Sequence, residues 1–417
     1  MSEPGRPLRI LLSEGSSTSG REALTILGLS GHIVHVCDPS RWCLTRFSRF
    51  VRKVHRCPTL RDDPAGYLAF VETLLSAQHF DVLLPIHEQG FLFARAGGRL
   101  RRHAALALPG FENYRIAHGK AGFSRLLSEL GMPQPATAIV HSERELRQAI
   151  HFPAVLKTSI GTASRGVWFV HDEAELARAV LDLDEHDAFA DEVLVQEMVA
   201  GTTEKAQSVF CRGQLLGFHA YRQITAGVGG GEAIKQSVSR PEIEAYFAKI
   251  GARLGWHGAL SIDYVVGDDD GLPRLIDCNP RLVEPMSAYL AGVDLVGLLL
   301  RVSMGETPAT VPHGREGVRS HLAMQALLGC AARGGTRRDL LRECWHLWKG
   351  RGAYAGSREE LTPVRLDWMG AIPLLMTFAL AFAAPRSAAA IAQRGFGASL
   401  LNAKGVRRVA SEGFAGV

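Results

Sequence analysis

The chain has 417 residues, of which 47% are hydrophobic and 21% charged, and its 47 Lys and Arg residues slightly outnumber its 42 Asp and Glu residues. These proportions are those of a folded globular protein of two or three domains, and they exclude a wholly disordered chain, a collagen and a coiled coil. The seven cysteines are scattered without a CxxC pair, which argues against a disulfide framework or a structural zinc site and favours a cytoplasmic location. The first residues lack the apolar run of a signal peptide.

The first hundred residues predict a parallel α/β domain. Residues 8–13 predict a short buried strand, residues 21–31 a helix that ends at a glycine, and residues 32–38 a second strand. The loop between the first strand and the helix has only two glycines. It therefore lacks the three-glycine spacing of a dinucleotide-binding fingerprint.

A later strand in this domain ends in polar residues. Residues 81–90 predict a buried strand with His87 and Glu88 near its carboxyl end. The carboxyl ends of strands in open α/β sheets face the ligand crevice, so His87 and Glu88 are candidate substrate contacts. Capping of the next helix is an equally good interpretation of the same two residues.

From about residue 111 the pattern changes to mixed α+β. Residues 120–131 predict an amphipathic helix that ends at a glycine. Several strands follow, and some are joined by short glycine-containing turns that favour antiparallel pairing. The expected strands are Ala154–Lys157, Gly166–Val170, Val193–Gln196, Ala206–Arg212, Leu215–Tyr221, Ala259–Val266 and Leu272–Cys278. We therefore expect an α/β domain over residues 1–110 and an α+β domain with antiparallel sheets over 111–312.

Residues 313–417 are expected to form a helical, basic region. Residues 315–417 contain 15 Lys and Arg but only 7 Asp and Glu. Trp368–Pro385 has no formal charge over 18 residues, the short end of the range for a membrane-spanning helix, and Gly370 and Pro373 interrupt it. A helix packed against the protein is the favoured interpretation. A helix that lies on an anionic membrane surface is the alternative, because basic residues flank the segment on both sides.

The strongest chemical signal is residues 261–281, SIDYVVGDDDGLPRLIDCNPR. Two predicted strands flank an acidic turn, and Asp277 and Asn279 occupy alternate positions of the second strand, so they point to one face. With Asp263 of the first strand they form an oxygen-only set that suits Mg²⁺ when the ion also binds phosphate. Arg281 projects the same way and can bind an anion there.

Two further segments are weak signals when each is taken alone. Lys157 ends a predicted strand and precedes the small-residue loop Ser159–Gly166, whose backbone N–H groups can approach phosphate oxygens. Gln196–Val199 ends an apolar strand before a turn at Gly201, and such a hinge can pair its backbone with an adenine edge. An ordinary strand and turn is the alternative for each segment.

Taken together and in this order, these segments resemble the ATP-grasp superfamily. The resemblance covers about residues 111–312, and in that family an N-terminal α/β domain usually precedes this part. It implies that Lys120 and Lys157 contact ATP phosphates, that the hinge at Glu197–Val199 binds adenine and that Glu204 reaches the ribose. The implied nucleotide-binding residues are Lys120, Lys157, Ser164, Gly166, Glu197, Met198, Val199 and Glu204. The implied Mg²⁺ (or Mn²⁺) ligands are Asp263, Asp277 and Asn279, and the implied catalytic residues are Lys157 and Arg281.

The sequence departs from the family pattern at two positions. Gly119 stands where an aspartate usually precedes the first lysine, and Asp263 stands where glutamate is commoner as a metal ligand. Between the hinge and the metal strands, Arg222 and Lys235 are candidate cations for an acyl phosphate. Ordinary surface cations are the alternative for these two.

The resemblance implies an ATP- and Mg²⁺-dependent ligase. In such an enzyme a carboxylate attacks the γ-phosphate of ATP, and an amine then attacks the acyl phosphate, with release of ADP and phosphate. By pattern the nearest groups resemble the carbamoyl-phosphate synthase large subunit and biotin carboxylase, so a carboxyphosphate-forming subunit is one alternative and a non-catalytic nucleotide-binding regulatory protein is another. The expected partners are small-molecule carboxylates and amines, and a homodimer is compatible with the pattern. No motif indicates nucleic acid, and the substrate pair stays open.

Overall fold

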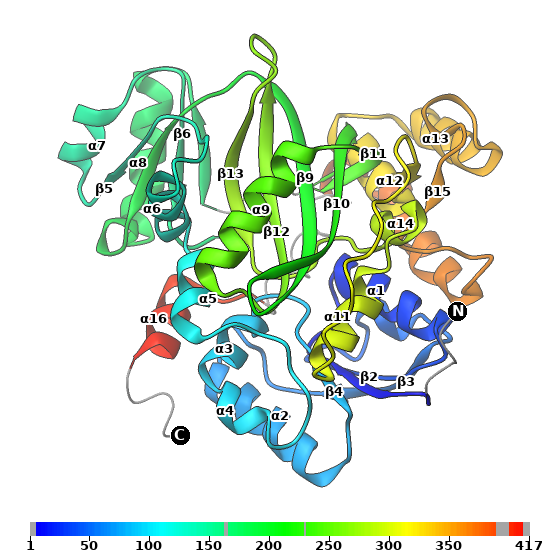
Figure 1. The fold of residues 1–417 in the computed structure, drawn as a ribbon. Helices are drawn as coiled ribbons and strands as arrows, with labels where there is room; N and C mark the ends of the chain where they lie inside the picture. The colour runs from blue at the N-terminus through cyan, green and yellow to red at the C-terminus, as the bar shows by residue number, and fades with distance from the viewer. Residues whose placement is uncertain (1–5, 162–165, 229–230, 389–399, 412–417) are drawn as a thin grey trace.

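The computed structural model describes residues 6–161, 166–228, 231–388 and 400–411, and it contains three β-sheets surrounded by helices (Figure 1). The N-terminal sheet has four parallel strands in the order β3-β2-β1-β4. Its strands are β1 (Arg9–Leu12), β2 (Ile33–Asp38), β3 (Val51–Arg56) and β4 (Val82–Leu84), and the helices of this part are α1 (Thr18–Leu29), α2 (Pro64–Ala77), α3 (Gln89–Arg95) and α4 (Gly97–Leu100). The expected parallel βαβ opening is therefore confirmed. β3 has no counterpart among the strands expected from the sequence, because its VRKVHR segment lacks the apolar run of a buried strand.

The central sheet has seven strands in the order β13-β12-β9-β10-β11-β14-β15, all antiparallel except the last pair. Its strands are β9 (Gly201–Cys211), β10 (Gln214–Ala226), β11 (Glu232–Val238), β12 (Gly258–Gly267), β13 (Pro273–Asn279), β14 (Arg319–His321) and β15 (Arg358–Glu359). The expected antiparallel pairing is confirmed. The C-terminal region, which is expected to be helical, also contributes two short strands, β14 and β15, which extend this sheet and cover the edge that β11 would otherwise expose.

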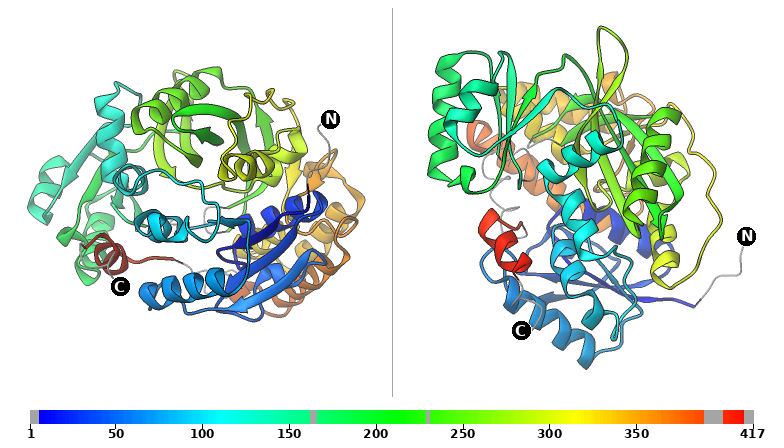
Figure 2. Two further views of the ribbon diagram at one scale, coloured as in Figure 1. Left: turned by 60° about the horizontal axis from the view of Figure 1, so that its bottom comes forward. Right: turned by 60° about the vertical axis from the view of Figure 1, so that its left-hand side comes forward.

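A smaller antiparallel sheet lies beside the central one, in the order β5-β8-β6-β7 (Figure 1). Its strands are β5 (Thr137–Val140), β6 (Ala154–Thr158), β7 (Val167–Val170) and β8 (Val193–Glu197), and its helices are α7 (Glu143–Ala149) and α8 (Glu173–Glu185). These elements bury a core of their own, with Leu146, Leu156 and Leu176 fully buried. The small sheet and the N-terminal sheet lie apart, with the cyan segment that contains α5 (Phe111–His118) between them (Figure 2).

The remaining helices connect these parts. They are α5 (Phe111–His118), α6 (Lys120–Glu129), α9 (Pro241–Leu254), α10 (Met286–Ala291) and α11 (Leu295–Ser303). One continuous core joins Phe91 of α3 and Tyr114 of α5 to Phe247 of α9 and Trp256, so hydrophobic packing crosses residue 110. The domain boundaries near residues 110 and 312 stay predictions.

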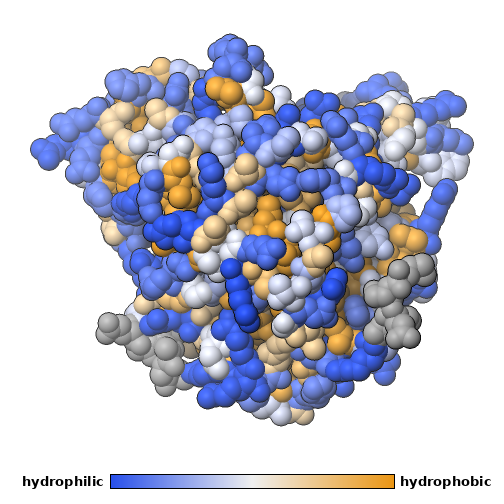
Figure 3. All heavy atoms as spheres, in the orientation of Figure 1, coloured by the Kyte–Doolittle hydropathy of each residue, from blue (hydrophilic) through white to orange (hydrophobic). Residues whose placement is uncertain are grey.

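The C-terminal helices are divided between two sides of the molecule. They are α12 (Ala323–Ala332), α13 (Arg337–Lys349), α14 (Ala371–Ala383) and α16 (Ala403–Ala410). The first three pack together beside the central sheet, whereas α16 lies against α3 (Figure 1). No helix among the described residues is long and apolar enough to span a bilayer. On the face shown in Figure 3, hydrophilic residues cover most of the surface and apolar residues form small groups between them.

Candidate functional site

A cavity of about 700 Å³ lies between the central sheet, the small sheet, the start of α1 and helix α12. It brings together most of the residues that the sequence singles out. Those that line it are His87, Lys120, Lys157, Glu197, Met198, Val199, Asp263, Asp277, Asn279 and Arg281. Ser164 lies outside the described residues, so the structure gives no position for it.

Two carboxylates face each other across the β12–β13 pair. Asp263 and Asp277 are directly opposite in the antiparallel register, and Asn279 lies opposite Ser261 two positions along. The Oδ1 atom of Asp263 is buried without a hydrogen-bond partner, and burial raises the pKa of this carboxyl above its usual range. Like charges placed directly opposite on two strands repel each other. A cation between them would remove this repulsion and supply the missing partner.

The donor set fits Mg²⁺ rather than zinc. It consists of two carboxylates and the amide of Asn279, whose Oδ1 accepts a hydrogen bond of 3.0 Å from Arg281. Hard oxygen ligands supplied by one or two carboxylates, completed by water and phosphate, are typical of Mg²⁺ sites. Among the described residues there is no group of three His, Cys, Asp or Glu side chains that could hold a metal by itself. The ion would therefore depend on phosphate oxygens for part of its coordination.

Two buried lysines lie next to this acidic pair. Lys120 Nζ is 3.5 Å from Asp277 Oδ1 and donates a hydrogen bond to the Gly161 carbonyl. Lys157 Nζ donates to the Ile276 carbonyl at 3.0 Å, and burial lowers the pKa of this lysine to about 8. An ammonium group that is largely removed from water gains most from an anionic ligand. Both lysines are therefore placed to bind phosphate oxygens.

The small-residue loop after Lys157 returns at Gly166. The Gly166 carbonyl accepts a hydrogen bond of 2.9 Å from the Thr158 backbone N–H. Gly166 has φ +75°, and a Cβ atom there would lie 2.2 Å from Thr158 Oγ1. Only glycine suits this position, because it combines a left-handed backbone with a close neighbour. Gly166 thus has a clear backbone role, while its contact with nucleotide stays a prediction.

The end of the cavity at the hinge is apolar. Met198 and Val199 follow β8, whose last residue, Glu197, donates its backbone N–H to Ala136. The apolar residues that line this end are Val155, Val167, Phe169, Met198, Val199, Val265 and Ile276. Several come from opposing strands of the two sheets, so they form a slot between the sheets. A slot of this kind suits a flat aromatic base.

The predicted ribose contact of Glu204 is not supported by the structure. Glu204 lies on the face of β9 that α9 covers, where it accepts two hydrogen bonds of 2.7 Å from Arg240 and one of 2.9 Å from the Tyr264 hydroxyl. Its neighbours Thr203 and Lys205 line the cavity instead. Successive residues of a strand point to opposite faces. β9 begins at Gly201, whereas the strand expected from the sequence begins at Ala206.

Three other candidates also lie outside the cavity lining. Arg222 is exposed on β10, whereas its neighbour Gln223 lines the cavity. Lys235 is fully buried in ion pairs with Glu284 and Glu360. Glu88 precedes α3 and accepts a hydrogen bond from the Leu401 backbone N–H, which ties down the segment before α16. The alternative interpretation of Arg222 as a surface cation is therefore the better one.

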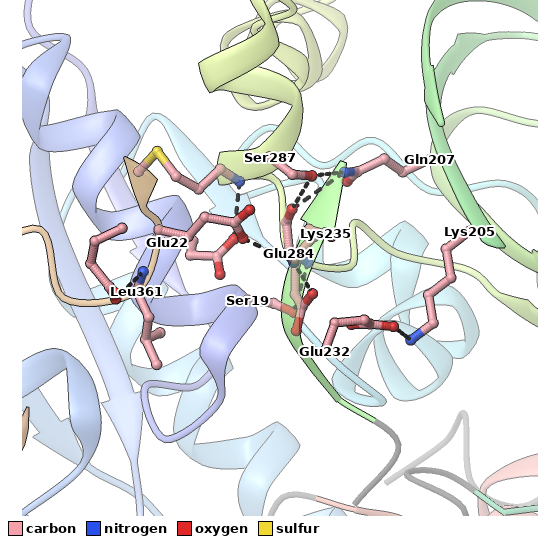
Figure 4. A network of polar contacts seen from close by, with 12 residues as sticks. Ser19, Glu22, Lys205, Gln207, Glu232, Lys235, Glu284, Ser287 and Leu361 are labelled. Carbon is pink, nitrogen blue, oxygen red and sulfur yellow. Dashed lines mark hydrogen bonds and ion pairs between the residues drawn. The ribbon is translucent and has the colours of Figure 1, made fainter. Parts of the chain in front are cut away.

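A network of buried charges underlies the other end of the cavity (Figure 4). Lys235 Nζ lies 2.9 Å from Glu360 Oε2 and closer still to Glu284, and Lys205 Nζ lies 2.6 Å from Glu232 Oε1. Burial opposes ionisation of Glu284, but Lys235 and Lys205 outweigh it and lower the pKa of this carboxyl. Burial raises the pKa of Glu232 and of Glu360 to about 7.

Backbone contacts connect this network to the N-terminal sheet. Glu22 of α1 accepts a hydrogen bond of 3.0 Å from the Met286 backbone N–H, and burial raises the pKa of Glu22 well above its usual range. Gln207 donates to the Glu284 carbonyl at 3.3 Å. Glu284 itself has φ +55°, an uncommon conformation for a residue with a side chain. No local sequence pattern indicates this network, because its members come from five separate segments.

The N-terminal domain and the C-terminal region both contribute to this end of the cavity. The start of α1 contributes Ser17, Thr18 and Ser19, the central sheet contributes Lys205 and Gln223, the loop after β13 contributes Glu284, and the C-terminal region contributes Gln325, Leu328 and Leu400. Half-buried His87 also lines the cavity, and removal of its ring from water lowers its pKa well below the usual value. The cavity thus has an apolar end and a polar, charged end with the two facing carboxylates between them.

No family model matches the chain, but its sequence is similar to known enzymes. It is 30% identical over 232 residues to the carbamoyl phosphate synthase large chain of Methanospirillum hungatei, which covers 51% of this chain and 21% of the relative. Over 205 residues it is 26% identical to the same enzyme from Archaeoglobus fulgidus, covering 46% and 19%. The chain thus spans about a fifth of the length of these relatives.

Solved structures share the fold. The biotin carboxylase domain of the Hydrogenobacter thermophilus 2-oxoglutarate carboxylase, solved with MgADP and bicarbonate, has a TM-score of 0.61 at 14% identity and covers 76% of this chain and 74% of its own. The N5-carboxyaminoimidazole synthetase of Staphylococcus aureus with ADP has a TM-score of 0.59 at 14% identity, covering 77% and 84%. An L-amino acid ligase from Bacillus licheniformis has a TM-score of 0.57 at 17% identity, covering 72% and 75%.

Proposed function

We propose that this chain is an ATP-dependent ligase of the ATP-grasp type, which activates a carboxylate as an acyl phosphate and transfers the acyl group to an amine. The observation that carries the proposal is the facing pair Asp263 and Asp277, with Lys120 and Lys157 beside it, in one cavity with an apolar end. This arrangement supports the proposal because it would give a bound ATP a slot for the base, cations for the phosphates and oxygen ligands for a metal ion.

The protein's own contribution is charge neutralisation and positioning. Lys120 and Lys157 would bind phosphate oxygens, and their burial strengthens each contact because little water competes. Asp263, Asp277 and Asn279 would hold Mg²⁺, which when bound neutralises charge on the phosphates. The guanidinium of Arg281 would orient the carboxylate and stabilise the acyl phosphate oxygens. The reaction requires no side-chain nucleophile.

The charged end of the cavity would hold the two substrates. Arg281 would offer a cation to a carboxylate, and Glu284, whose carboxylate also pairs with Lys235, would offer an anion to an amine. Glu284 follows Arg281 by three residues, so both charges lie close to the metal strands. This proximity favours a ligase that binds both substrates next to the transferred phosphate.

An ADP-release assay tests the proposal. Purified full-length protein with Mg²⁺ and ATP is screened against pools of carboxylates, bicarbonate included, and pools of amines. The proposal expects ADP release that requires one carboxylate and one amine together. If the folded protein fails to bind Mg-ATP in calorimetry, the proposal is wrong. If bicarbonate alone stimulates ADP release as strongly as any pair, the carboxyphosphate-forming alternative replaces it.

A further inference from the structure

The C-terminal region exposes an unusual concentration of large apolar side chains. Of the seventeen exposed large hydrophobic residues in the described chain, nine lie within residues 341–376. They are Leu341, Trp345, Trp348, Val364, Leu366, Trp368, Ile372, Leu375 and Met376. Single exposed apolar residues are normal on a protein surface, whereas a local concentration of them marks an interaction site. We call α13, residues 364–368 and α14 together the C-terminal face.

The exposed residues follow helical spacing. On α13 the exposed apolar residues are Leu341, Trp345 and Trp348, spaced by four and three positions. On α14 they are Ile372, Leu375 and Met376, and Ala379 continues the same face. Three or four positions separate residues on one side of a helix. Each helix therefore has an outer apolar side.

The outer sides are distinct from the sides that pack. Buried Leu340 of α13 and Ala381 of α14 belong to the core that these helices form with Leu327, Leu328 and Ala331 of α12. The favoured expectation of a packed helix within Trp368–Pro385 thus describes only one side of α14. The other side carries no charged residue over the whole helix. A helix that faced only water on this side would normally carry polar residues there.

The fully exposed charged residues of this part of the chain are all basic. Within the continuously described stretch 333–386, nine basic residues are exposed: Arg333, Arg337, Arg338, Arg342, Lys349, Arg351, Arg358, Arg365 and Arg386. None of the five acidic residues in the same stretch is exposed. Asp367 is buried against Arg21, Glu360 against Lys235, and Glu343 accepts a hydrogen bond from Tyr354. Asp339 lies nearer the surface, where it accepts a hydrogen bond of 2.7 Å from Arg342. The exposed charge of this stretch is therefore mainly positive.

Two of the tryptophans lie directly beside cations. Lys349 Nζ is 4.0 Å from the centre of the Trp348 ring, and the Arg351 guanidinium is 5.0 Å from the centre of the Trp345 ring. Tryptophan next to a basic residue is typical of the boundary between lipid headgroups and acyl chains, where the ring is partly buried and the cation meets phosphate.

We propose that the C-terminal face binds the surface of an anionic lipid bilayer, independently of the proposed catalytic function. The charge-free side of α14 would enter the headgroup boundary together with Trp348 and Trp368. The surrounding arginines and lysines would contact lipid phosphates, each adding to the affinity. The helices would lie on the membrane rather than cross it.

Charge decides against two other occupants. A second copy of the chain would bring the same positive surface against itself, and these like charges would repel each other. A nucleic acid would satisfy the basic residues but would leave the charge-free side of α14 without an apolar partner. Only an anionic bilayer offers phosphate and hydrocarbon together.

Vesicle co-sedimentation of the full-length protein tests the proposal. Vesicles of phosphatidylcholine alone are compared with vesicles in which about 30% of the lipid is phosphatidylglycerol. We expect binding to the anionic vesicles at low salt that is at least about tenfold tighter than to phosphatidylcholine and that weakens as salt is added. Tryptophan emission should shift to the blue on binding. The absence of binding to both vesicles would overturn the proposal.

Surface variants separate membrane binding from general effects. Replacing the apolar side (Leu375→Ser with Met376→Ser) or reversing charge (Arg338→Glu with Arg365→Glu) should each weaken binding about tenfold or more. The matched controls are Leu181→Ser and Arg178→Glu on α8, which are equally exposed, and these should change binding by less than about twofold. Thermal unfolding should stay unchanged, because none of these side chains is buried.

Two results would assign the face to another partner and overturn the proposal. The first is a dimer in analytical ultracentrifugation that Leu375→Ser with Met376→Ser dissociates, together with no vesicle binding. The second is binding to a DNA duplex that is as tight as binding to anionic vesicles and is insensitive to the apolar substitutions. A monomer that binds anionic vesicles and loses this binding in both variants supports the bilayer.

Discussion

The two ends of the cavity are assembled in different ways. The end between the sheets is built from short strand motifs, each confined to a few consecutive residues, such as Asp277 to Arg281 or Glu197 to Val199. The charged end depends on Glu22, Lys205, Lys235 and Glu360, which come from α1, β9, β11 and the segment after β15. The end between the sheets should therefore tolerate changes elsewhere in the chain, whereas the charged end should lose its structure when the surrounding fold is destabilised.

The largest expected effect is loss of turnover at the metal strands. Asp277→Asn keeps the size of the side chain but removes one of two facing carboxylates. With the substrates identified, kcat should fall by roughly three orders of magnitude, because phosphoryl transfer loses several kcal/mol of charge stabilisation. The matched control is Asp269→Asn in the exposed turn between the same strands, which should keep wild-type ADP release. Similar rates for both variants would refute the metal assignment.

Replacement of Lys235, the buried cation of the charged network, should destabilise the protein strongly. Lys235→Met leaves Glu284 and Glu360 buried without their shared partner, so the free energy of unfolding should fall by about 3–5 kcal/mol in chemical denaturation. The control Lys249→Met changes an exposed lysine of α9 and should have little effect. Adding Glu284→Gln to Lys235→Met should restore part of the loss, because one uncompensated charge is removed. If Lys235→Met alone were as stable as the wild type, this network would have no stabilising role.

The effect of Lys157→Ala should be confined to nucleotide binding. The substitution removes one charge-assisted contact to a phosphate, which should weaken ATP binding by about 1.5–3 kcal/mol in calorimetry. Lys53→Ala, at an exposed position on β3, serves as the control. If Lys157→Ala bound ATP with wild-type affinity, Lys157 would have no phosphate contact.

The smallest expected effect concerns pH. Burial raises the pKa of the Glu360 carboxyl from its ordinary value to about 7, so the folded state binds this proton more tightly than the unfolded state. The resulting stabilisation is complete below the ordinary pKa and is lost as the pH rises through about 7. Between pH 5.5 and 8 the free energy of unfolding should fall, and Glu360→Gln should reduce this fall by about 1 kcal/mol. If the free energy of unfolding depended on pH equally in the wild type and in Glu360→Gln, this role of Glu360 would be contradicted.

Sequence periodicity was a good guide wherever a strand and its motif coincide. The alternation of Asp277 and Asn279 predicts a shared face, and both line the cavity. The same rule, applied from Gly201 onward, would have placed Lys205 toward the cavity and Glu204 away from it. The ribose contact of Glu204 came from the family resemblance alone, and the structure places this carboxylate with Arg240 and Tyr264 rather than in the cavity lining.

The sequence by itself determined the local features of this protein: the parallel βαβ opening, the antiparallel strands, and the short motifs that line the end of the cavity between the sheets. These depend on interactions between residues close in the chain, which period and turn chemistry reveal. Only the tertiary structure decided which charges are buried together and which apolar sides are left exposed. Lys235 looks like any lysine of a polar strand, and the outer side of α14 looks like any core helix, until partners distant in sequence cover one and leave the other uncovered.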